Sequence, residues 1–111
     1  MWDLEYLLEY TKQCHEAKDA TEILNIVQDI EKLDYFYQQG NQMAIIELVQ
    51  KVIKDHKTEV DEHDKGRLPA QDIHHLYHSC RGFLVGLGRD KIEKKAKEKF
   101  MEEALKHLGG N

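Results

Sequence analysis

Apolar residues recur every three or four positions along most of the chain, and this spacing is typical of amphipathic helices. Interruptions of the pattern divide it into five segments, at about residues 2–18, 20–39, 42–64, 69–87 and 90–108. No stretch shows the alternation of period two that is typical of a half-buried strand. We therefore expect an all-α fold, an antiparallel bundle of four to five amphipathic helices that forms one domain over residues 1–111.

The apolar stripe of each segment predicts which residues face the core. For the second and third segments these are Ile23, Ile26, Val27, Ile30, Leu33, Tyr37, Ile45, Leu48, Val49, Val52 and Ile53. For the fourth they are Ile73, Leu76, Tyr77, Cys80, Leu84 and Leu87. In the last segment Ile92, Ala96, Phe100, Ala104 and Leu108 follow one another at intervals of four, which predicts a stripe that packs into the same bundle.

Turn and capping residues predict the segment boundaries. Gly40 suits the left-handed position after a helix, and Asn41 suits the cap of the next one. The sequence from Asp19 to Glu22 has the form of a capping box at the start of the second helix. Pro69 fits the first turn of the fourth helix, and Gly88 is expected to end it.

Two glycines, Gly82 and Gly86, fall inside the fourth predicted helix. Each costs about 1 kcal/mol relative to alanine in a helix interior. We expect close helix packing or room for a partner to offset this cost.

Charge and composition narrow the classes of function. The chain has a formal net charge of −5, which disfavours nucleic acid as a partner. No apolar run approaches the roughly 20 residues that span a membrane, and the acidic N-terminal residues do not resemble a signal peptide. Cys14 and Cys80 lack a disulfide-framework spacing, so we expect free thiols in the cytoplasm, although a bond between them stays open.

The residues around His78 include several that could together bind a ligand or transfer a chemical group. Arg81 follows His78 by three residues and Gly82 by four, so both lie beside the imidazole on a helix surface, and Gly88 follows ten residues on. These residues, with apolar Ile73 and Leu76 before them, resemble the histidine phosphotransfer (HPt) domain over residues 73–96. The resemblance implies a phosphocarrier in which His78 accepts a phosphoryl group. Arg81 would be its charge partner, and Gly82 would leave room for the donor protein.

A metal site is the weaker hypothesis for the same helix. His74 and His78 are four residues apart and project from one face, which is a spacing that zinc can use when a third ligand comes from elsewhere. The sequence contains no HExxH motif and no CxxC pair. We expect no metal and no other cofactor.

Our leading hypothesis is a small non-catalytic regulator or adaptor that works by protein–protein binding. It rests on the lack of a recognisable catalytic motif and on aromatic residues outside the predicted core stripes, because tyrosine and tryptophan are enriched in binding hot spots. The candidate partner-binding residues are Trp2, Tyr6, Tyr10, Tyr35 and Phe36. The expected partner is another protein or a second copy of the chain, and the HPt-like phosphocarrier is the alternative.

Overall fold

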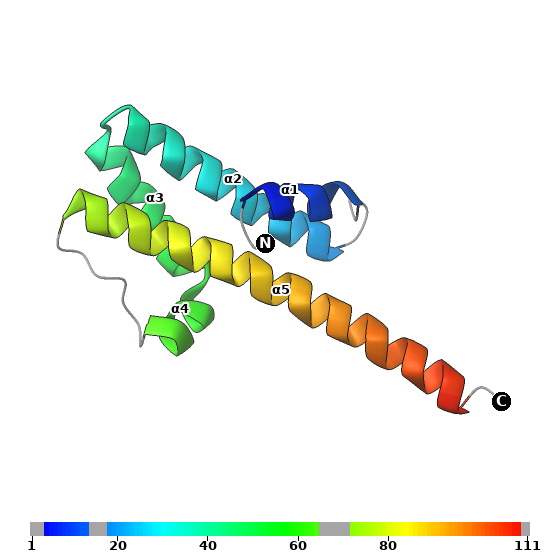
Figure 1. The fold of residues 1–111 in the computed structure, drawn as a ribbon. Helices are drawn as coiled ribbons and strands as arrows, with labels where there is room; N and C mark the ends of the chain where they lie inside the picture. The colour runs from blue at the N-terminus through cyan, green and yellow to red at the C-terminus, as the bar shows by residue number, and fades with distance from the viewer. Residues whose placement is uncertain (1–3, 14–17, 65–71, 110–111) are drawn as a thin grey trace.

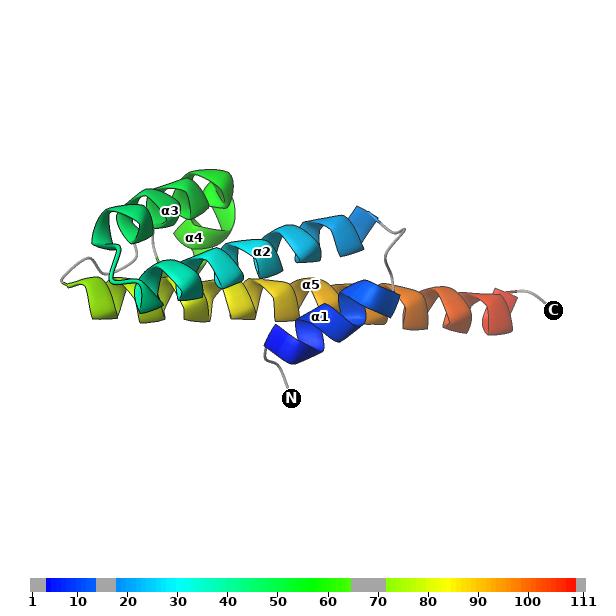
Figure 2. The same ribbon diagram turned by 90° about the horizontal axis from the view of Figure 1, so that it is seen from above.

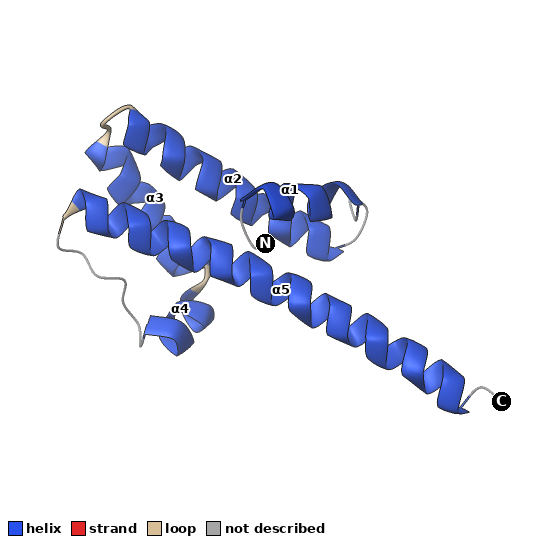
Figure 3. Cartoon of the chain, viewed as in Figure 1, coloured by secondary structure: helices blue, strands red, loops and turns tan. Residues whose placement is uncertain are grey.

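The computed structural model describes residues 4–13, 18–64 and 72–109. Within these ranges the chain forms five α-helices and no strand, so the expected all-α fold is confirmed (Figure 3). The helices are α1 (Leu4–Gln13), α2 (Lys18–Gln38), α3 (Gln42–Asp55), α4 (Lys57–Asp64) and α5 (Ile73–Gly109).

Helices α2 and α5 run antiparallel and form the axis of the bundle (Figure 1). Helix α1 folds back along the first half of α2 and touches α5, while α3 folds back from the other end of α2 and packs on both α2 and α5 (Figures 1 and 2). The short helix α4 turns away from the end of α3. Helices α1 and α2, and α2 and α3, are neighbours both in sequence and in space, as is usual in helical bundles.

The core consists largely of the apolar stripes that the sequence predicts. Among the described residues, α2 contributes six apolar side chains that are at most 1% exposed, those of Ala20, Ile23, Ile26, Val27, Ile30 and Leu33. α3 and α5 supply Ile45, Leu48, Val49, Val52, Leu76, Cys80, Leu84 and Leu87, all buried. Leu7 closes the core from the side of α1. Burial of these side chains stabilises the fold because each transfers apolar surface out of water.

Helix α5 differs from the prediction. The sequence predicts two helices, 69–87 and 90–108, separated at Gly88, but residues 73–109 form one continuous helix. Gly88 lies inside it and is buried against Leu7, whose nearest methyl carbon would lie 2.9 Å from a Cβ added at residue 88. Because glycine has no side chain, α1 can pass close to α5 at this residue. The helix continues through Gly88 instead of ending there, so residues 90–108 do not turn back to the bundle.

The other glycines of α5 have open surroundings. A Cβ added at Gly82 or Gly86 would meet nothing within 4 Å. Close helix packing therefore does not account for these two residues, whereas it does account for Gly88. Gly82 is also exposed, so the helix surface beside it is open to solvent.

The third predicted helix, 42–64, is divided at His56. The backbone of His56 leaves the helical region at φ −120° and ψ 38°, and α4 begins at the next residue. Its N–H still bonds to Val52, and its carbonyl accepts from Val60, so the break leaves these groups satisfied. Val60 of α4 lies in the core beyond the bend and is fully buried.

Some of the predicted capping residues are confirmed at the helix ends, and others are not. Gly40 has φ +70° and Asn41 accepts a hydrogen bond from the N–H of Ala44, as predicted. α2 begins at Lys18, so Asp19 lies within its first turn and is not the cap that the sequence suggests. α5 begins at Ile73 rather than at Pro69, which lies outside the described residues, and the carboxylate of Asp72 caps it by accepting from the N–H of His75 at 2.8 Å.

The last half of α5 extends beyond the bundle (Figure 2). A helix of 37 residues is about 55 Å long at 1.5 Å per residue, which nearly spans the longest dimension of the molecule, 60 Å. Ile92 is the last buried residue of α5. We call residues 93–109 the arm.

Candidate functional site

His78 is exposed on the second turn of α5, near the end of the bundle where α2 finishes. The exposed Gly82 follows one turn later, and the space beside it is open. Phe83 and Leu84, the next residues of α5, are buried in the core. The imidazole of His78 is therefore on an accessible strip of helix surface.

Asp34 of α2 organises the residues around His78. Its Oδ1 accepts a hydrogen bond from the Tyr77 hydroxyl at 2.5 Å and another from Arg81 Nε at 3.1 Å. Burial, and then the bond to Asp34, raises the pKa of Tyr77 to about 12. The Asp34–Arg81 ion pair, partly buried on both sides, turns the guanidinium toward α2. Arg81 thus connects two helices.

Tyr37 adds an aromatic stack to this cluster. Its ring lies parallel to that of Tyr77, with centroids 3.9 Å apart and planes within 4°. The Tyr37 hydroxyl bonds to Nδ1 of His74, and the His78 ring meets the Tyr77 ring edge-on at 4.9 Å. The two histidines are therefore part of an aromatic cluster that joins α2 to the start of α5.

The described residues hold no group of three or more His, Cys, Asp or Glu side chains that could bind a metal ion. The His74–His78 pair has no third ligand in this part of the chain. Asp34 and Tyr37 complete the cluster around these histidines. The sequence predicts Tyr37 only as a core-facing residue and does not single out Asp34. The two are three residues apart on α2 and so share a helix face, which is a sign in the sequence that they could act together.

The predicted partner-binding aromatic residues do not form one surface. Tyr6 is exposed on α1, while Tyr10 is half-buried against the core. Tyr35 is exposed and Phe36 half-buried in the last turns of α2, whereas α1 lies beside the first half of α2 (Figure 1). Trp2, the remaining member of the set, lies outside the described residues.

The arm carries the largest group of exposed apolar side chains. Four of them are between 52% and 85% exposed: Phe100, Met101, Leu105 and Leu108. Phe100 and Met101 are adjacent, and Leu105 and Leu108 follow at intervals of four and three, so the four side chains lie on one broad helix face. The sequence predicts that Phe100 and Leu108 pack into the bundle. The structure contradicts this because α5 does not turn back.

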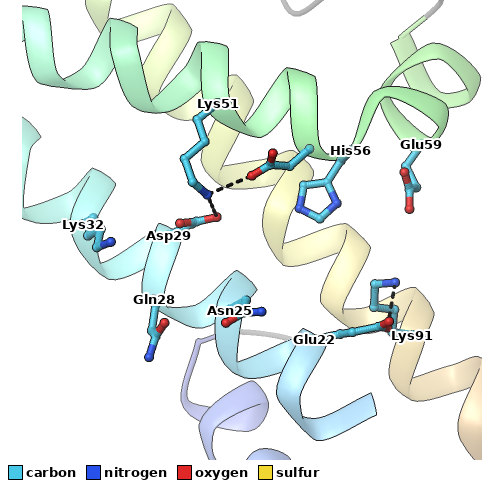
Figure 4. Close-up of a pocket in the computed structure, with 10 residues that line it drawn as sticks. Glu22, Asn25, Gln28, Asp29, Lys32, Lys51, His56, Glu59 and Lys91 are labelled. Carbon is cyan, nitrogen blue, oxygen red and sulfur yellow. Dashed lines mark hydrogen bonds and ion pairs between the residues drawn. The ribbon is translucent and has the colours of Figure 1, made fainter. Parts of the chain in front are cut away.

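A polar hollow of about 500 Å³ lies between α2, α3, α4 and α5 (Figure 4). Lys51 crosses its upper edge, with Nζ 2.9 Å from Asp55 and 3.6 Å from Asp29. Its hydrogen bond with Asp55 raises the pKa of Lys51 and lowers that of Asp55. Lys91 pairs with Glu22 on the opposite side at 3.3 Å. The Lys51–Asp29 and Lys91–Glu22 pairs join helices across the hollow, while Lys51–Asp55 lies within α3, so these charges stabilise the bundle.

Cys80 of α5 is a free thiol, and its side chain is fully buried in the core. Burial, and secondarily the carboxylate of Asp29, raises its pKa to about 12. Since the thiolate is the reactive form of cysteine, this side chain is an inert part of the core and not a nucleophile.

None of the described helices is long and apolar enough to cross a membrane. No protein-family model, no curated protein and no solved structure matches the sequence or the fold.

Proposed function

We propose that this chain is a non-catalytic binding module that presents the arm of α5 to another protein. The observation that carries the proposal is the apolar face of Phe100, Met101, Leu105 and Leu108 on a helix that leaves the bundle. Contiguous apolar surface of this kind is stabilised when a partner covers it. Lysines and glutamates flank the face along the whole arm, which gives it the polar rim common to protein interfaces.

The arm replaces the aromatic residues of α1 and α2 as the main binding surface in this proposal. Tyr6 and Tyr35 remain exposed but lie on separate parts of the bundle, so each could add only a local contact. We place the module in the cytoplasm because Cys80 is a free thiol, which is typical of a reducing compartment.

A photo-reactive benzophenone amino acid in place of Met101 tests the proposal in the cells that make the chain. Irradiation should give a discrete protein adduct, because the side chain at residue 101 lies within the proposed interface. Met43, which is similarly exposed but lies on α3, is the matched control position and should give none.

The adduct at residue 101 should also disappear when Phe100 and Leu105 are both replaced by glutamate. Absence of any adduct at residue 101, or equal labelling from residues 101 and 43, would contradict the proposal. Mass spectrometry of the adduct identifies what the arm binds.

A second candidate is the HPt-like phosphocarrier, supported by the exposure of His78 and the open space beside Gly82. In this function the phosphoryl group leaves its donor as a new P–N bond forms to the imidazole of His78. Phe83 and Leu84 point into the core and so do not obstruct the approach. The Asp34–Arg81 ion pair would have to share its guanidinium with the phosphate.

Native mass spectrometry before and after exposure to phosphoramidate tests the second candidate. The phosphocarrier predicts an acid-labile gain of one phosphoryl group, which His78→Gln abolishes. His75→Gln, which removes another exposed histidine of the same helix, should leave the gain unchanged. No gain in the unmodified chain, or equal loss in both variants, would exclude His78 as the acceptor.

A further inference from the structure

We propose that the arm of α5 pairs in antiparallel orientation with the arm of a second copy of this chain. The inference rests on the proposed function, since it names the partner for which the arm is exposed. It commits to a symmetric dimer in which each arm contributes the same face. Symmetric pairs of this kind are the commonest form of protein oligomer.

The apolar face is large enough for a weak dimer. Each of its four large side chains, Phe100, Met101, Leu105 and Leu108, still exposes half of its surface or more. Burial of an apolar side chain of this size removes roughly 60–120 Å² from water, by the transfer free energies of such side chains, so four on each of two arms would bury roughly 500–1,000 Å². The upper end of this range is near the lower limit for a specific interface. We therefore expect a dissociation constant in the micromolar range.

The charges along the arm favour the antiparallel orientation. Residues 94–99 contain four lysines and one glutamate, a net of +3, whereas residues 102–107 contain two glutamates and one lysine, a net of −1. Antiparallel pairing places each basic segment against the acidic segment of the other copy. Parallel pairing would place Lys97 against Lys97 and Lys94 against Lys94 beside the apolar face, which costs free energy through like-charge repulsion.

The shape of the molecule agrees with the same orientation. The bundle occupies one end of α5 and the arm extends from the other (Figure 2). Two arms of about 25 Å at 1.5 Å per residue can overlap along their length when the bundles lie at opposite ends. In a parallel pair the two bundles would lie at the same end and compete for space.

Sedimentation equilibrium of the purified full chain tests for the dimer. At roughly 100 μM, well above a micromolar dissociation constant, the mass should approach twice the 13.1 kDa of one chain. The Phe100→Glu, Leu105→Glu double variant should remain at the mass of one chain.

The matched control is Leu24→Glu with Met43→Glu, which makes the same charge change at two exposed apolar residues of the bundle. It should dimerise as the unmodified chain does. A monomer at every concentration, or an equal loss of dimer in both double variants, would overturn the inference.

Two charge variants test the orientation. One carries Lys97→Glu and Lys99→Glu, and the other Glu102→Lys and Glu103→Lys. In an antiparallel pair each variant alone turns attraction between the segments into repulsion, so each should dissociate at least tenfold more readily than the unmodified chain. An equimolar mixture should recover association, which also shows that both variants are folded. The Lys97→Glu, Lys99→Glu variant decides between the orientations, because it would relieve the repulsion between lysines in a parallel pair. If this variant dimerises as strongly as the unmodified chain or more strongly, the antiparallel orientation is wrong.

These results separate the inference from the proposed function. A purified chain that stays monomeric while residue 101 cross-links to a different protein in cells would overturn the dimer and leave the binding module intact. If neither the dimer nor the adduct is found, both the inference and the proposed function are wrong.

Discussion

Replacing Leu84 with alanine should lower the free energy of unfolding by about 3 kcal/mol. Leu84 is fully buried in α5 and belongs to the core cluster, to which α2 and α3 also contribute. The loss combines the removed apolar atoms with the cavity that closely packed helices cannot fill. Urea unfolding followed by far-UV circular dichroism measures it. A domain of this size has a total stability of about 5–15 kcal/mol, so the variant should still fold.

Leu24→Ala is the matched control for this prediction. Leu24 is in α2 beside buried Ile23, but its side chain is exposed. The same chemical change should therefore cost less than about 1 kcal/mol. Equal losses at residues 84 and 24 would show that the core does not lie where the structure places it.

The helices and their core faces follow from the sequence because the pattern that predicts them is local. Periodic apolar residues, with Gly40 and Asn41 between the second and third segments, correctly place α2, the start of α3 and most of their buried side chains, but not the end of α3. A stripe of this kind has one low-energy arrangement, in which its apolar side leaves water.

The continuity of α5 could not be predicted from local pattern. Glycine after an apolar stripe suits a helix end and a tight helix crossing equally well. At Gly88 the choice depends on Leu7, which is 81 positions earlier in the chain and contacts it only in the folded bundle.

The candidate functional surfaces likewise have parts that the local sequence pattern predicts and parts that depend on contacts made only in the folded chain. The i, i+4 series from Ile92 to Leu108 predicts an apolar helix face but does not say what covers it, so the same pattern serves a core helix and the exposed arm. The contacts of Asp34 with Tyr77 and Arg81 span 43 and 47 residues. Only the antiparallel arrangement of α2 and α5 brings these residues together.

Replacing Gly88 with leucine should lower the free energy of unfolding by about 2–3 kcal/mol. The new side chain would have to occupy the space of Leu7, which is itself fully buried. Either α1 moves away from α5, or both helices distort. Since Thr11 is the only other buried side chain among the described residues of α1, we expect α1 to move.

Gly82→Leu separates this close approach from the general effect of replacing glycine in a helix. Gly82 is in the same helix with nothing near its Cα, so leucine there should be neutral or stabilise the chain by up to about 1 kcal/mol. Hydrogen exchange gives the local measurement: amides of α1 should lose protection in Gly88→Leu alone, while those of α3 keep it. If both variants behave alike and α1 stays protected, Gly88 is an ordinary helix position and α1 is not held by contact with it.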